Sequence, residues 1–191
     1  HFLFSNFNLK AGLTEGDRDN EGYFVKPVAG GDEVRATADD FKSTTPLIPY
    51  QHIRHFKLAT DNSFKLGKNR LSLNIGYQRN QREEFGNPDD MNERELYFDL
   101  KTVTYTAQFH FKEVQGWKTS IGVNGMKQQN SNRGAEQLIP DFNLFDIGGY
   151  AYAQKSYEKI TISGGARYDT RNIDAKNLLE GSEIKGSAFN K

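Results

Sequence analysis

Residues 55–85 read HFKLATDNSFKLGKNRLSLNIGYQRNQREEF, and apolar and polar side chains alternate through most of this stretch, on either side of the short segment Leu66–Asn69. Period-two alternation is the pattern of a strand with one apolar and one polar face. Each half continues for about a dozen residues, roughly twice the usual length of a strand in a soluble domain. The stretch therefore predicts a long β-hairpin with one polar face, and this expectation constrains the possible folds more than any other feature.

Four further segments show the same alternation and predict additional strands of this kind. No segment predicts an amphipathic helix longer than two turns. One segment is out of phase, because Leu96–Leu100 places its apolar residues on the opposite parity to those that follow from Val103. A β-bulge near Lys101 or Thr102 is expected to reconcile the two. The four segments are Phe7–Leu13, Val103–Phe111, Thr119–Gly125 and Ile160–Tyr168.

The expected connections alternate between short and long. This order places every short turn at one end of a sheet and every long loop at the other, as in transmembrane β-barrels. We therefore predict an all-β fold, an antiparallel up-and-down meander of about seven to eight long strands. The short connections are Leu66–Asn69, Lys112–Gly116 and Ser156–Lys159, and the long ones are Glu15–Gln51, Glu84–Glu95, Ser131–Asp141 and Asn172–Lys185.

Composition narrows the class of protein further. The 25 basic and 25 acidic residues balance, so no overall charge attracts nucleic acid or an acidic membrane surface. The chain contains no cysteine, which excludes a disulfide scaffold and thiol chemistry. It also lacks a run of about 18 apolar residues, the length expected of a transmembrane helix. Both ends interrupt strand-like patterns, so we expect residues 1–191 to form one partial domain of a larger protein.

A transmembrane β-barrel explains both the length and the two-sided character of the expected strands. A strand tilted across an outer membrane needs about 9–11 residues and can extend beyond the lipid. Polar side chains would then line a wet lumen, and apolar side chains would contact lipid. The alternative is a large soluble sheet with one solvated face, which Thr60 and Asn62 on the expected lipid face favour.

The chain resembles the mid-barrel region of TonB-dependent outer-membrane receptors, especially those of the Bacteroidetes type. Three motifs carry the resemblance by their order and spacing, and the hairpin over residues 55–85 fits the region that precedes them. Together they cover roughly residues 50–175. The motifs are Trp117 and Thr119 followed by Gly122–Gly125; Leu138–Asp141 opening a strand that contains Gly148–Ala151; and Gly165–Asp169 followed by Arg171.

The resemblance implies a barrel of about 22 strands closed by an N-terminal plug domain. It implies a transporter in the outer membrane of a Gram-negative bacterium that takes up a bulky, scarce nutrient such as siderophore-bound iron, haem, cobalamin or a glycan. The implied partners are outer-membrane lipid, a small-molecule or glycan ligand at the outer loops, above all Glu15–Gln51, and TonB, acting through a plug domain that is not expected within residues 1–191. This chain would be a wall segment of that transporter.

Two alternatives stay open. The first is a porin-like or other structural outer-membrane barrel, which shares every pattern argument and differs only in the motif match. The second is a soluble secreted β-sheet binding module, in which another layer of the same chain would bury the apolar parity. We expect no nucleic-acid partner, no cofactor and no enzyme activity, because no arrangement of nucleophile and base stands out in the sequence.

Arg167, Asp169 and Arg171 share a parity, which would face the lumen near the outer mouth of the barrel. They are candidates for contacting an anionic ligand such as a carboxylate. Arg133, from the long loop Ser131–Asp141, is expected to join them from outside. The alternative is a ladder of wall charges that pair across neighbouring strands, with Arg133 solvated.

Other groups of histidine, acidic and aromatic residues give no further candidate for a ligand or metal site. His52 and His55 lie three residues apart on an expected strand, so their side chains point to opposite faces and cannot share a metal ion. The acidic loop EEFGNPDDMNERE lacks the ligand spacing of a calcium-binding EF-hand loop and is expected to be solvated. Four aromatic residues near strand ends are expected to anchor the barrel at the lipid–water interface, namely Tyr97, Trp117, Tyr150 and Tyr152.

Overall fold

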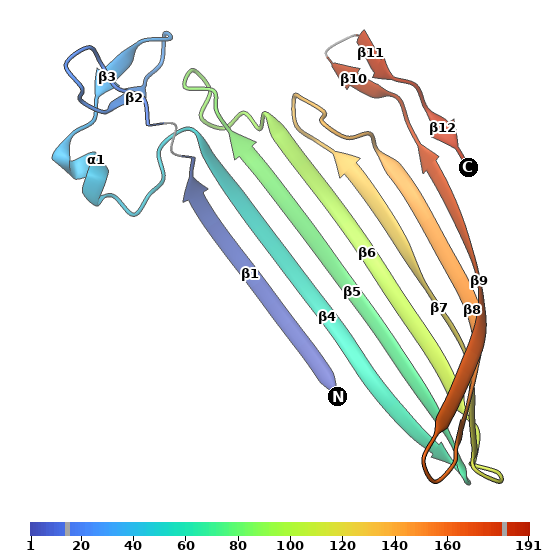
Figure 1. Ribbon diagram of the computed structural model, residues 1–191. Coiled ribbons are helices and arrows are strands. Elements are labelled where there is room, and N and C mark those ends of the chain that lie inside the picture. Colours follow the sequence, from blue (N-terminus) through green and yellow to red (C-terminus); the bar gives the residue numbers. More distant parts are fainter. Residues whose placement is uncertain (14–15, 181–182) are drawn as a thin grey trace.

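The computed structural model describes residues 1–13, 16–180 and 183–191 and shows one long, curved antiparallel sheet (Figure 1). Its strand order is β1-β4-β5-β6-β7-β8-β9-β12, so every strand pairs with the next long strand along the chain. The expected all-β meander is confirmed. The long strands are β1 (Phe2–Gly12), β4 (Tyr50–Leu66), β5 (Asn69–Phe85), β6 (Leu96–His110), β7 (Trp117–Asn132), β8 (Phe142–Ser156) and β9 (Thr161–Ala175), and the two-residue strand β12 (Phe189–Asn190) is the eighth member of the sheet.

The two kinds of connection lie at opposite ends of the sheet, as the sequence predicted (Figure 1). The β4–β5 turn has only two central residues, and the first of them, Gly67, has φ 64°. A type II′ hairpin turn requires a positive φ at this position, which glycine adopts at no steric cost. At the other end, a short hairpin of β10 (Leu178–Glu180) and β11 (Glu183–Gly186) lies within the connection after β9.

The long connection between β1 and β4 folds into a small unit that contains β2 (Val25–Pro27), β3 (Glu33–Arg35) and α1 (Ala38–Lys42). Thr37 caps α1, since its hydroxyl accepts from Asp40 N at 3.3 Å and its own N–H donates to Asp40 Oδ2 at 2.7 Å. Lys26 Nζ lies 2.6 Å from Asp40 Oδ1 and ties β2 to the helix. These bonds lower the pKa of Asp40 to about 2, chiefly through the hydrogen bond from Lys26.

Strand register divides the side chains between two faces. We call the face that carries Ile75, Tyr105 and Val123 face A, and the face that carries Asn74, Thr106 and Asn124 face B. Elements contact one another only where they are hydrogen-bonded strand neighbours, so within the described ranges no second layer covers either face. The layer that a soluble binding module would need is not found in this part of the chain.

Face A changes character halfway along the strands. Between the short turns and the row Tyr77–Val103, its side chains are mostly apolar and mostly exposed. The next row is polar on every strand from β5 to β9, and the rows beyond it carry Gln81, Asp99 and Glu83. We call the apolar half of face A the apolar band. The first polar row comprises Arg79, Lys101, Gln129, Asn143 and Asp174.

The prediction of a β-bulge near Lys101 or Thr102 is wrong. β6 pairs with β5 and with β7 without a register shift through this region. Leu96–Leu100 has the opposite parity to Val103 because its apolar side chains lie on face B, while Tyr97 and Asp99 continue face A. The alternation of faces is therefore continuous along β6, and only the environment of each face changes between its two ends.

Candidate functional site

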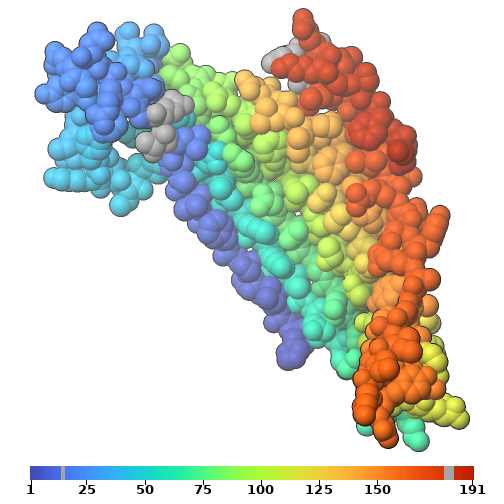
Figure 2. Space-filling view, in the orientation of Figure 1, coloured from blue at the N-terminus to red at the C-terminus, as the bar shows by residue number. Residues whose placement is uncertain are grey.

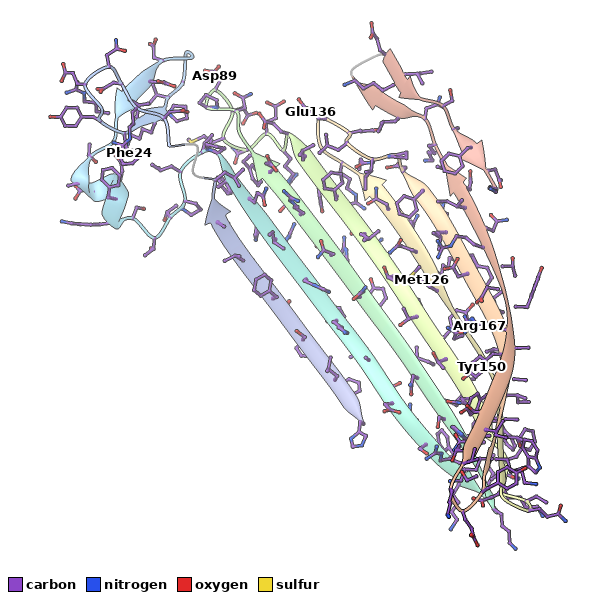
Figure 3. The ribbon with its side chains drawn as sticks, viewed as in Figure 1. Phe24, Asp89, Met126, Glu136, Tyr150 and Arg167 are labelled. Atoms are coloured by element: carbon purple, nitrogen blue, oxygen red, sulfur yellow. The ribbon has the colours of Figure 1, made fainter. Side chains whose placement is uncertain are left out.

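The three charged residues predicted on β9 lie together on face B. Arg171 binds Asp146 of β8 through two parallel hydrogen bonds, from Nε and Nη2, each 2.7 Å long. Arg167 Nε donates to Asp169 Oδ2 at 2.6 Å, and the Arg167 guanidinium lies 5.9 Å from the ring centroid of Tyr150 (Figure 3). Arg171 thus pairs across neighbouring strands, as in a wall-charge ladder, whereas Arg167 pairs with a carboxylate of its own strand. A role in binding an anionic ligand stays a prediction.

Arg133 does not join this group. Its Nη2 lies 3.3 Å from Asp99 Oδ2, and its backbone N–H donates to Tyr97 O at 2.9 Å. Asp99 is an odd-numbered residue of β6 and belongs to face A. Asp146 is paired with Met126 of β7, which in turn is paired with Thr104 of β6, so Asp146 belongs to face B. Arg133 therefore lies on the opposite face of the sheet from the ladder on β9.

Face A instead holds a network of buried acids that the sequence did not predict. Asp99, 1% exposed, receives two hydrogen bonds of 2.7 Å from Arg79, besides the contact with Arg133. Glu83, 2% exposed, contacts Arg54 Nη2 at 2.9 Å and Arg94 Nε at 2.8 Å. Because each buried carboxylate has more than one cationic partner, both acids are compensated.

Tyr97 connects the two halves of this network. Its hydroxyl accepts a hydrogen bond of 2.6 Å from Gln81, and the guanidinium carbons of Arg94 and Arg133 lie 5.4 and 5.8 Å from its ring centroid. The contacts couple β5 and β6 to the loops that follow β5 and β7. Sequence parity contained the signal, because Arg79, Gln81 and Glu83 continue the apolar parity of β5, but the expected bulge obscured the matching position of Asp99 on β6.

The aromatic residues expected at the lipid–water interface do not share one environment. Trp117 lies at the short-turn end of face A, beside Lys155, and is 44% exposed, and its interfacial role stays a prediction. Tyr97 is buried in the network instead, and Tyr150 and Tyr152 lie on face B. The expectation is therefore wrong for Tyr97, and for Tyr150 and Tyr152 it stays a prediction.

Three glycines of the resemblance motifs lie beneath large side chains of neighbouring strands. The Tyr150 ring lies over Gly122, and a Cβ at either Gly122 or Gly148 would overlap a cross-strand side chain. At Gly125, a Cβ would overlap the Asp146 carbonyl oxygen, which accepts a 2.8 Å hydrogen bond from the Tyr105 hydroxyl. The motif glycines thus allow side chains to lie flat across the sheet between β6 and β9.

Histidines and acids form no metal centre in the described ranges, where no group of three or more potential ligands converges. The expected divergence of His52 and His55 is confirmed, since their parities place them on faces A and B. His52 Nε2 lies 2.7 Å from Asn8 Oδ1, and its Nδ1 lies 3.3 Å from Glu83 Oε2. His52 is therefore a member of the face A network.

The loop over residues 86–95 is not uniformly solvated. Asp89 Oδ1 accepts a 2.6 Å hydrogen bond from Gly30 N, which joins this loop to the segment between β1 and β4 (Figure 2). Glu95 is partly buried, and burial together with the carboxylates of Glu136, Glu84 and Glu93 raises its pKa above the ordinary value of 4.5. The loop therefore takes part in the packing at the long-loop end of the sheet.

A cavity of about 600 Å³ lies where the β1–β4 connection and the 86–95 loop meet β1 and β4 at the long-loop end of the sheet. We call it the rim cavity. Apolar side chains from the 13–49 segment and from the 86–95 loop form most of its wall, and Lys10 and Tyr50 close it from the sheet. Its volume falls within the range of typical small-molecule pockets, roughly 300–1,000 Å³.

Comparison with protein families, with curated proteins and with solved structures found no match. Among the described residues, no helix has the length and apolarity needed to cross a lipid bilayer.

Proposed function

We propose that this chain is a wall segment of a TonB-dependent outer-membrane transporter for a bulky nutrient, in the outer membrane of a Gram-negative bacterium. The observation that carries the proposal is the apolar band. It is largely exposed and lies on face A, and from β5 to β9 it ends before a row that is polar on every strand, while the strands continue. A solvated sheet face has no reason to change character along one line, whereas a bilayer boundary is such a line.

The dimensions of the band agree with this reading. On β5 it covers nine residues, from Asn69 to Tyr77. At about 3.3 Å per residue and a tilt of about 40°, this length spans a height of roughly 23 Å, close to the ~25 Å apolar belt of outer-membrane barrels. The facing residues of face B are largely polar, as a water-filled lumen requires.

The outermost long strands also fit a wall segment. Among the described residues, β1 pairs only with β4, and its apolar side chains are exposed on both faces, with Phe4 at 62% and Phe7 at 49%. Within the same ranges, β9 pairs only with β8 over most of its length. Exposed strand edges of this length offer hydrogen bonds to further strands, and a larger barrel would supply them.

The resemblance distinguishes an energised transporter from a passive barrel, and uptake measurements test the difference. Cells that produce the protein should contain it in the outer-membrane fraction and should lose uptake of its nutrient when TonB is deleted. Uptake that is unaffected by loss of TonB would favour the porin-like alternative. Recovery of the protein in soluble fractions would overturn both barrel proposals.

A further inference from the structure

The rim cavity has a wall suited to an apolar molecule. Val28, Leu47, Ile48 and Met91 line it, together with three prolines of the two loops. Leu47 and Met91 are 43% and 67% exposed, so apolar surface is available to a ligand. A ligand that covered these side chains would gain roughly 25 cal/mol for each Å² of apolar surface removed from water.

The charge of the cavity has one sign. Among the described residues, Lys10 and Lys26 are its charged lining residues, and no acid lines it. Lys26 is neutralised by Asp40, but within the described ranges no carboxylate lies at ion-pair distance from Lys10. The Lys10 ammonium lies 5.8 Å from the ring centroid of Tyr50, and this weak contact leaves its charge available to an anion.

The walls are held in place by contacts outside the cavity. Gly30 N donates to Asp89 across the two loops, and the rings of Tyr50 and Phe85 stack with centroids 4.7 Å apart. A ligand therefore meets walls that are already ordered, which lowers the entropic cost of binding.

We propose that the rim cavity binds a small organic anion with an apolar body, whose carboxylate, sulfonate or phosphate contacts Lys10. The proposal deepens the proposed function, because it assigns a ligand class to the long-loop end of the wall. It rests on that function only for the side of the membrane on which the cavity lies.

A cysteine protection assay tests the proposal. The chain has no cysteine, so Met91→Cys introduces a single thiol at the wall of the cavity. The rate of its alkylation by a membrane-impermeant maleimide is measured in isolated membranes, with naphthalenesulfonate or with neutral naphthalenesulfonamide as the probe. The sulfonate should slow alkylation at a concentration roughly tenfold lower than the sulfonamide, the usual contribution of one hydrogen bond to a charged group.

Lys10→Gln in the Met91→Cys background should remove the preference for the sulfonate and leave protection by the sulfonamide unchanged, which also shows that the cavity remains folded. The matched control is Lys57→Gln, because Lys57 lies on face B and outside the cavity lining. It should keep the preference. Equal protection by both probes, no protection by either, or an equal loss in both lysine variants would overturn the proposal.

The same thiol separates this proposal from the proposed function. On intact cells, the impermeant maleimide should modify Met91→Cys, since the long-loop end faces outward. A thiol that is unreactive on intact cells but protected by the sulfonate in isolated membranes would overturn the orientation and support the binding site. A thiol that is reactive on intact cells but shows no preference for the sulfonate would do the reverse.

Discussion

The two halves of face A are built on the same strands with the same alternation, yet they have opposite chemistry. Toward the short turns, Ile75 and Val123 are exposed and apolar. Toward the long loops, Asp99 and Glu83 are buried and paired with arginines. Exposed apolar and buried charged side chains invert the usual order of a soluble protein. Parity therefore determines the face on which a side chain lies, while its height along the strand determines its environment.

The largest expected loss of stability comes from removing a buried acid in the polar half of face A. Asp99→Ala leaves Arg79 and Arg133 without their acid, and it should lower the free energy of unfolding by about 3–5 kcal/mol. Asp146→Ala removes a pair of the same geometry, but Arg171 is 63% exposed, so the loss should stay below about 1 kcal/mol. Urea unfolding of the detergent-solubilised protein, followed by circular dichroism, measures both. Equal losses would mean that burial does not distinguish the two pairs.

A single charged side chain tests the apolar half of face A. Ile75→Arg places a guanidinium in the middle of the apolar band and should cost about 2–4 kcal/mol of stability in the membrane, with less protein recovered in the outer-membrane fraction. Asn74→Arg, the neighbouring position on face B, should be tolerated because it faces the opposite side. If the two variants reach the membrane equally well, face A does not contact lipid.

Gly125 offers a smaller test within the apolar band. Gly125→Ala should overlap the Asp146 carbonyl and displace the Tyr105 hydroxyl, and we expect a loss of about 1–3 kcal/mol in urea unfolding. Gly164→Ala also lies on face A, where a Cβ would meet no atom within 4 Å. This control should be neutral or slightly stabilising, by up to about 1 kcal/mol. A neutral Gly125→Ala would contradict the close approach of Tyr105.

The smallest effect concerns pH and the loop beside the buried network. Because the pKa of Glu95 is raised in the folded protein, its ionised form opposes folding, and that cost is relieved as pH falls through the raised pKa. Glu95→Gln should therefore increase stability at neutral pH by less than about 1 kcal/mol. The wild type and the variant should converge in acid, below the usual glutamate pKa. A constant difference between them across pH in urea unfolding would contradict this assignment.

The sequence predicted the strands well because alternation is a local signal. The meander, the short turns and the place of each long connection all follow from it, and the pattern in Leu71–Tyr77 was enough to orient β5. The buried network could not be predicted in the same way. Its acids come from different strands, its arginines Arg94 and Arg133 come from loops, and only the three-dimensional register brings them together.

The same limit explains which candidate site residues were placed correctly from the sequence and which were not. Parity correctly grouped Arg167 and Asp169 on one face, but it carries no information about a residue in a connection. Arg133 follows the end of β7, and its side chain turns toward Asp99. The rim cavity is a further example, since it forms between the 13–49 segment and the 86–95 loop, which are distant in sequence.

The strands continue well past the row where the apolar band ends. On β5, Phe85 lies eight residues beyond Tyr77, which at the same tilt corresponds to a rise of roughly 20 Å. In a barrel of this design the wall would extend beyond the lipid, and the arginine–carboxylate contacts around Tyr97 would stiffen it. Molecules arriving from the medium would meet the rim cavity before they came near the bilayer, so selection would begin at a distance from the membrane surface.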